Sequence, residues 1–174
     1  DQTNPDVAIA YQTLLEVSRE VQAEGWTFNK ENHYKMVRNT DNEILIPNNI
    51  LQIDATDNAE NVELDVIRRS GKLYDKAHHK YTFDKDIEVD IVWLFDWVDL
   101  PKPIADFITA RAATITSSRI VGDNNLYQIL QQKEAFTRAM AMEYECNQGD
   151  YTFFGHSGNT NQYISYQPYK ALIR

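Results

Sequence analysis

Two carboxylates, Glu88 and Asp90, come nearest to the residue types and spacing of a catalytic pair. They alternate with Ile87, Val89 and Ile91, which predicts one shared strand face with Cα atoms ~6.6 Å apart at a rise of ~3.3 Å per residue. Two carboxyl groups at about that separation can flank a glycosidic bond. The same alternation is typical of the solvent-facing side of a strand. We expect the solvated face and keep a glycan hydrolase as the alternative function.

Other chemistries have weaker support. Asp96 and Asp99 flank Trp97 as in a sugar platform, but these residues equally suit a strand end that leads into a helix. The glycines are scattered, and neither a phosphate-binding loop nor a Gly-x-Ser-x-Gly elbow occurs. The possible metal ligands lack the paired spacing of a zinc site; they are His33, His78, His79, His156 and Cys146. We therefore predict no catalytic residue, no cofactor and no metal.

The composition is that of one globular domain. The chain has 174 residues, of which 43% are hydrophobic and 11% aromatic, enough for a sizeable core. Its net charge of −9 disfavours docking of the whole surface on nucleic acid or an anionic membrane. The apolar runs are too short for the ~20 residues that a membrane span requires. One cysteine leaves no internal disulfide.

A first helix must position the segments that follow. Asn4, Pro5 and Asp6 predict its start, and Gly25 predicts its end. Apolar residues recur at helical spacing between these points; they are Val7, Ala10, Tyr11, Leu14, Leu15, Val17 and Val21. We expect this stripe to pack against later helices, with self-association through the same face as the alternative.

Residues 26–99 read as a meander of short strands. We expect Trp26–Phe28 to be extended and Ser70-Gly71 to be a two-residue hairpin turn. The strands are expected at His33–Arg38, Glu43–Ile46, Ile50–Asp54, Val66–Arg69, Lys72–Asp75 and Ile87–Trp93. An acidic loop, expected to be solvated, contains Asp54, Asp57, Glu60, Glu63 and Asp65.

Two long helices follow in residues 100–148. Pro101 and Pro103 open the first, Gly122 ends it, Asp123 caps the second and Gly149 ends that one. Apolar residues at helical spacing indicate both helices; they are Ile104, Phe107, Ile108, Ala112 and Ile115, then Leu126, Ile129, Leu130, Phe136, Met140 and Tyr144.

The last residues, 149–174, form an irregular aromatic tail that we expect to cover its own domain or a neighbouring subunit. The predicted fold is therefore α+β. It is an antiparallel helix bundle with an inserted meander of short antiparallel strands and this C-terminal tail, in one domain 1–174 that comprises residues 1–25, 26–99, 100–148 and 149–174.

A run of short motifs gives the sequence a resemblance. The first is Arg19–Asn29, in which Gly25, Trp26, Thr27, Phe28 and Asn29 follow a helix. The later motifs are Leu73-Tyr74-Asp75, Leu100-Pro101, Ala110–Ala113, Met142–Glu145 and Ala171–Arg174. In this order they resemble the tail tubular protein A family of T7-like short-tailed phages. Members carry a further helix before the Asn-Pro-Asp start, so we expect an N-terminal segment of the full gene product to be missing.

The resemblance implies a structural virion protein. It implies a dodecameric ring, an adaptor or gatekeeper that binds the portal above and the nozzle (tail tubular protein B) below and helps hold the tail fibres. Genomic DNA would pass through the lumen without sequence-specific binding, in a virion tail assembled in the host cytoplasm. A non-viral oligomeric scaffold is a weaker alternative.

Aromatic residues are the candidates for subunit and partner contacts because Tyr, Trp and Phe are enriched at interface cores. These candidates are Trp26, Phe28, Tyr151, Phe153, Phe154, Tyr166 and Tyr169. For Trp26 and Phe28 we weigh a second interpretation, in which they fasten the first helix to the sheet.

Overall fold

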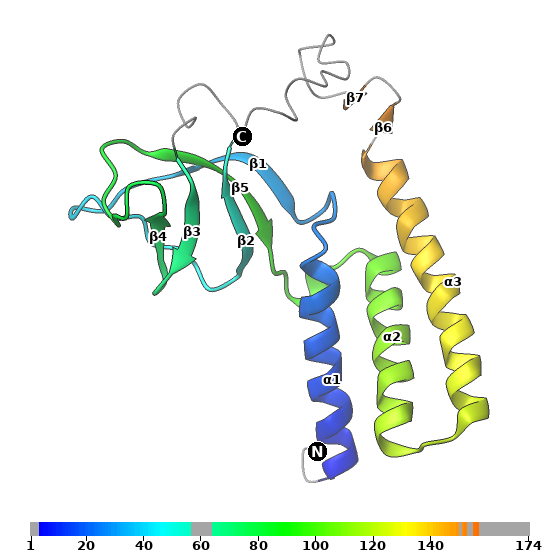
Figure 1. Cartoon of the computed structure of the whole chain (residues 1–174). Coiled ribbons are helices and arrows are strands. Elements are labelled where there is room, and N and C mark those ends of the chain that lie inside the picture. The colour runs from blue at the N-terminus through cyan, green and yellow to red at the C-terminus, as the bar shows by residue number, and fades with distance from the viewer. Residues whose placement is uncertain (1–3, 57–63, 150, 153–154, 157–174) are drawn as a thin grey trace.

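The computed structural model describes residues 4–56, 64–149, 151–152 and 155–156. These residues form a helical part and a β part (Figure 1). The chain crosses between the two parts twice, through residues 23–29 and residues 94–101. The arrangement confirms the predicted α+β class.

Helix α1 spans Pro5–Gln22 and begins where the sequence predicts. The side-chain oxygen of Asn4 accepts a hydrogen bond from the backbone N–H of Asp6 at 2.9 Å. This bond satisfies one of the donors that a helix start leaves free. Beyond the helix, Gly25 has φ +78°, a conformation that glycine adopts without strain and that turns the chain toward the β part.

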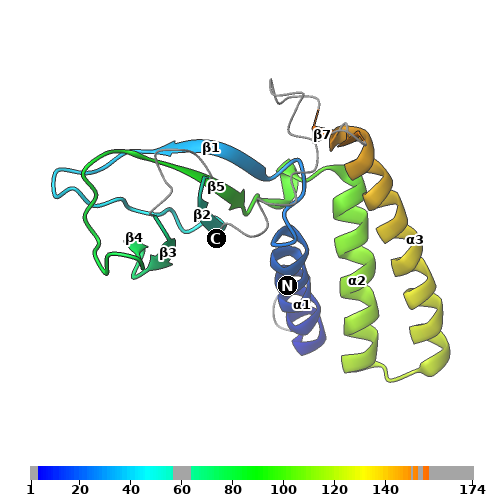
Figure 2. The same cartoon turned by 45° about the horizontal axis from the view of Figure 1, so that its top comes forward.

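Helices α2, Lys102–Ile120, and α3, Asn124–Gly149, form the predicted pair. Gly122 has φ +68° in the connection. The carboxylate of Asp123 then accepts the backbone N–H of Asn125 at 2.8 Å and caps α3. Helix α2 lies between α1 and α3 in both views (Figures 1 and 2). The antiparallel helices therefore form one layer, which leaves α1 and α3 with sides that no other described helix covers.

Strand β5, Ile87–Trp93, is the centre of a three-stranded antiparallel sheet. Its neighbours are β1, Lys30–Met36, and β2, Ile50–Ala55. Residues Ile87, Val89 and Ile91 are buried, as the alternation predicts. Strand β1 contains a bulge at which His33 has φ +57°, and six of its seven residues are exposed.

A separate hairpin consists of β3, Val66–Arg69, and β4, Lys72–Asp75. Ser70 and Gly71 have φ +53° and +73°, so both turn residues adopt the left-handed backbone conformation. Such turns match the twist of the flanking strands. The predicted Ser70-Gly71 hairpin is confirmed.

Two local predictions are wrong. Trp26–Phe28 is a turn rather than an extended segment, because the Trp26 carbonyl accepts the N–H groups of Asn29 and Lys30, each at 3.0 Å. Glu43–Ile46 pairs only at isolated bridges instead of forming a strand. In that segment Ile44 and Ile46 hydrogen-bond to the β3–β4 hairpin at single points while their side chains enter the core.

The boundaries of other segments also differ from prediction. The first strand begins three residues before the predicted His33 and ends at Met36. Residues Trp97–Asp99 form the short 3-10 helix η1. After α3, β6 (Tyr151–Thr152) pairs with β7 (Gly155–His156). Most of the acidic loop and of the aromatic tail lies outside the described residues.

The buried apolar residues fall into two clusters, one for each part of the molecule. The β core contains Met36, Ile44, Ile46, Ile50, Val66, Leu73, Phe83, Ile87, Val89 and Ile91. The helical core contains Val17, Val21, Trp26, Ile104, Phe107, Ile108, Ala112 and Ala141. Because the cores are separate, the contacts at the two chain crossings decide how the parts are held together.

Candidate assembly site

Two buried amide side chains, Gln22 and Asn29, connect the helical part to the β part; both are fully buried. The Asn29 amide donates to the carbonyl oxygens of Gln22 and Trp93, each at 2.8 Å, and accepts the N–H of Trp26 at 2.9 Å. The Gln22 amide accepts the N–H of Phe95 at 2.8 Å and donates to its carbonyl at 3.2 Å. We call these five residues the joint. Both amide side chains have hydrogen-bond partners for their donors and acceptors in the interior, and these bonds fix the geometry of the joint.

Helix α3 is fastened to the same place by Glu145. Its carboxylate accepts the backbone N–H of Thr27, at 3.0 Å to Oε1 and 2.9 Å to Oε2, and the Thr27 hydroxyl at 2.6 Å. Thr27 and Glu145 belong to two of the motifs that carry the resemblance, far apart in sequence. The structure brings those motifs into direct contact.

The candidate contact residues Trp26 and Phe28 lie at this crossing. Trp26 is 3% exposed in the helical core, and its indole N–H donates to the carbonyl of Val21 at 2.7 Å. Phe28 is half-buried, with its ring 6.1 Å from that of Phe95. The indole thus packs among the helices rather than in the β core. A direct role of either residue in subunit contact stays a prediction.

The other candidates lie in the tail. The backbone of Tyr151 is in β6, but its side chain is outside the described part of the structure. Phe153, Phe154, Tyr166 and Tyr169 lie outside the described residues altogether. Their predicted role in partner contacts is carried forward as a prediction.

Helix α3 exposes a row of large apolar side chains that we call the α3 stripe: Ile129, Phe136 and Met140, which are 63%, 66% and 44% exposed. Among residues of α3, only Ala141 and Gly149 are buried. Three of the six apolar residues that mark the helical period of α3 are therefore exposed rather than packed against the rest of the molecule.

The reason is that polar side chains occupy the inner side of α3. Glu134 contacts Arg111 of α2 at 3.7 Å, and Arg138 contacts Glu24 at 3.2 Å. The residues that contact the rest of the molecule recur at spacings of four, three and four, from Glu134 through Arg138 and Ala141 to Glu145. On a helix at about 100° per residue, this inner side lies about 150° from the α3 stripe.

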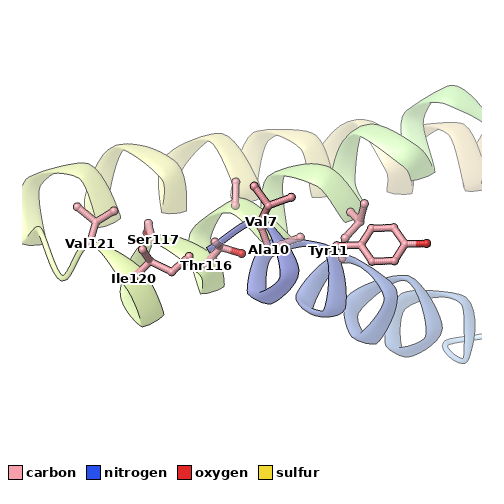
Figure 3. A pocket seen from close by; sticks show the side chains of 10 residues that line it. Val7, Ala10, Tyr11, Thr116, Ser117, Ile120 and Val121 are labelled. Atoms are coloured by element: carbon pink, nitrogen blue, oxygen red, sulfur yellow. The ribbon is translucent and has the colours of Figure 1, made fainter. Parts of the chain in front are cut away.

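Two grooves lie along α1. One groove of about 540 Å³ lies between α1 and α2, where residues of both helices line it (Figure 3). A second groove of about 480 Å³ lies between α1 and the segment that ends at Trp97. Tyr11 and Leu14 line both grooves, so we treat them together as the α1 groove. Its rim includes Val7, Tyr11 and Leu15, which are 48%, 48% and 46% exposed.

The carboxylate pair of β5 contacts His33 at the bulge of the neighbouring strand β1. The Asp90 carboxylate accepts the Thr56 hydroxyl at 2.8 Å and the backbone N–H of His33 at 3.1 Å. The Glu88 carboxylate lies 3.4 Å from Nδ1 of His33. Both carboxylates thus hold the His33 bulge, an arrangement that explains them without substrate chemistry.

Asp75 is a buried carboxylate that the sequence analysis did not single out as a site residue. Its side chain is fully buried, and Oδ2 lies 2.6 Å from Nδ1 of His78. Burial raises the pKa of Asp75, but hydrogen bonds from His78 and from the backbone N–H groups of His78 and Ala77 outweigh it, so this pKa is below its ordinary value. The sequence signal for this contact was an Asp at the end of a strand with a His three residues later.

Among the described residues, no group of three or more His, Cys, Asp or Glu side chains is placed to hold a metal ion. Within those residues, no helix combines the length and apolar character needed to cross a membrane.

Comparison with known proteins identifies the family. The family model for tail tubular protein matches residues 1–151. A search of curated proteins finds no match. The match spans both chain crossings and the whole helical layer, and it agrees with the resemblance seen in the sequence motifs. The chain belongs to the tail tubular protein family, whose members are structural proteins of the phage tail.

Proposed function

We propose that this protein is the ring-forming adaptor of a short-tailed phage, placed between the portal and the tail nozzle. Twelve copies form the ring, which binds the portal on one side and the nozzle protein, tail tubular protein B, on the other. The ring also helps attach the tail fibres. The proposal extends the family assignment and the motif resemblance from a tail component to one position in the tail.

The observation that carries the proposal is the exposed apolar surface of the helical layer. Phe136 is 66% exposed and Ile129 63% exposed, on a well-formed helix. Monomeric proteins rarely leave large contiguous apolar patches in water, and such patches commonly mark protein–protein contacts. A tail component with apolar surface on both outer helices is suited to contact neighbouring copies on two sides.

The proposed ring conducts DNA without reading it. The net charge of −9 makes the average surface acidic. An acidic lumen repels phosphates, so passing DNA does not adhere to it. In this function the protein has a mechanical role and no catalytic step, which is consistent with the structural use of Glu88 and Asp90 at the His33 bulge.

The test is the symmetry of the particle. Mass photometry and negative-stain imaging of the purified protein, alone and with the portal, should show a closed ring of twelve copies. Addition of the nozzle protein should extend the particle on the face away from the portal. A protein that stays monomeric and ignores both partners at near-physiological salt would overturn the proposal.

A further inference from the structure

We propose that neighbouring copies join head to tail, with the α3 stripe of one copy seated in the α1 groove of the next. This inference rests on the proposed ring and names the two surfaces that build it. The occupant of the groove is a second copy of this chain.

The first observation is that α3 has two distinct packing sides. Its inner side contacts α2 and the joint region through residues such as Glu134 and Glu145. The α3 stripe lies on another side, where nothing described in this chain covers it. Phe136 forms a ridge, and a ridge packs best into a recess.

The second observation is that α1 supplies such a recess. The α1 groove is apolar where α1 faces α2, and it continues past Leu14 to Leu94 and Phe95. From Val7 to Ser18 its floor follows α1 for about 16 Å at 1.5 Å per residue. From Ile129 to Met140 the stripe has the same length by the same measure. Ridge and recess therefore match in apolar character.

Charges at the two surfaces are also complementary. Asp96 lines the α1 groove, and Lys133 flanks the α3 stripe. Both are exposed, and neither has an ion pair within the described part of the chain. Arg19 lines the same groove and Glu143 flanks the same stripe, so each surface carries charges of both signs.

The heights of the two surfaces within the layer agree. Arg111 of α2 contacts Glu20 of α1 at 2.6 Å and Glu134 of α3 at 3.7 Å, which places those two glutamates at one level. Ile129 lies five residues before Glu134, and Leu15 lies five residues before Glu20. Rotation of one copy onto the next about an axis along the helices keeps these levels and brings Ile129 level with Leu15. The stripe therefore starts beside the second groove, which Leu15 and Asp96 line.

The geometry favours a closed ring over a pair. The stripe and the groove are different surfaces, and they belong to helices on either side of α2 (Figure 2). A contact between unlike surfaces is heterologous: each copy uses both surfaces and leaves one of each free for further copies. Closure of that series gives a ring.

Complementation between two variants tests the pairing. Phe136→Glu disables the stripe and Leu15→Glu disables the groove; both positions are exposed, so each monomer should fold. Each variant alone should be monomeric. In a mixture, the Leu15→Glu variant supplies an intact stripe and the Phe136→Glu variant supplies an intact groove. The two variants should therefore form a 1:1 dimer, and nothing larger, in mass photometry. Val37→Glu is the control, at a residue that is 67% exposed in the β part, and should leave the ring unchanged.

Charge exchange supplies an independent measurement. Lys133→Glu and Asp96→Lys should each weaken assembly by about two- to fivefold, as expected for an exposed charge pair, and the double variant should restore most of that loss. Failure of the restoration with intact single-variant effects would overturn the Lys133–Asp96 pairing.

The outcomes separate this inference from the proposed function. Rings that persist in both Phe136→Glu and Leu15→Glu would overturn the surfaces assigned here and leave the ring intact. Monomeric variants whose mixture gives no dimer would overturn the head-to-tail contact. A wild-type chain that stays monomeric even with the portal would overturn the proposed function itself.

Discussion

Trp26 shows how one side chain can serve both the core and the connection between the two parts. The indole is buried in the helical core, and its N–H donates to the carbonyl of Val21 in the last turn of α1. Its neighbours in sequence include Asn29, whose amide reaches β5. The types of these residues were readable from the sequence, but their contacts were not, because each depends on a partner distant in the chain.

We expect Trp26→Ala to lower the free energy of unfolding of the monomer by roughly 3–5 kcal/mol, since truncation leaves a cavity in the helical core. Urea denaturation followed by circular dichroism measures it. Trp26→Phe, which keeps most of the volume, should cost less. A Trp26→Ala monomer of unchanged stability that fails only to assemble would instead place the indole in a subunit contact.

Acid should destabilise the β part through Asp75. Because the pKa of Asp75 is lowered in the folded state, its contribution is fully present above the ordinary carboxyl pKa and is lost as the pH falls below that value. Asp75→Asn should therefore be less stable at neutral pH by about 1–3 kcal/mol. It should also lose less stability than the wild type on acidification.

Denaturant titrations at neutral and at acidic pH check this. The control is Asp84→Asn, at a carboxylate whose side chain is 99% exposed and which should leave the pH profile unchanged. If the free energy of unfolding changed with pH in the same way for the wild type and for Asp75→Asn, this would contradict the role given to the buried carboxylate.

At the scale of elements, the helices could be predicted better than their packing. Caps and breakers at Asn4, Gly122 and Asp123 gave the ends of α1, α2 and α3 closely. Period alone did not say which side of α3 packs, because the helix has an apolar stripe facing solvent and a side with Glu134 and Arg138 facing the molecule. The residues that this side contacts, Arg111 and Glu24 among them, settle that choice.

The strands show a similar limit. Alternation found β5, the central strand, whereas Glu43–Ile46 alternates equally well and pairs only at single bridges. Trp26–Phe28 has the composition of a strand but turns, because Asn29 bonds back to it. The apolar periodicity of α3 could be read from the sequence, but the exposure of the residues proposed for assembly could not.

Two substitutions on α3 should behave in opposite ways. Ala141→Leu inserts volume at a position that is 0% exposed, and we expect it to cost roughly 1–3 kcal/mol of monomer stability. Phe136→Glu, on the same helix, should stay within about 0.5 kcal/mol of the wild type because the side chain is exposed. Thermal and urea unfolding at low protein concentration make the comparison. Equal losses at both positions would mean that the stripe is part of the monomer core.

At the scale of the whole molecule, the single helical layer makes stability depend on neighbours. Partners that bind only the folded state raise its apparent stability by mass action. We expect the melting temperature of the wild type to rise with protein concentration, by several degrees over about a hundredfold range.

Differential scanning calorimetry across that concentration range measures the effect. Phe136→Glu should melt at one temperature throughout, since it cannot use its stripe. A wild-type melting temperature that is independent of concentration would contradict stabilisation by neighbouring copies.

The outer strand β1 has a consequence for how the protein can be stored and produced in quantity. Unprotected strand edges recruit further strands and lead to amyloid-like precipitation. Here the left-handed backbone conformation of His33 interrupts the hydrogen-bond pattern of β1, and Lys30, Glu31 and Lys35 place charges along this strand. Concentrated preparations of the protein should therefore stay free of precipitation that starts from one β1 edge pairing with another.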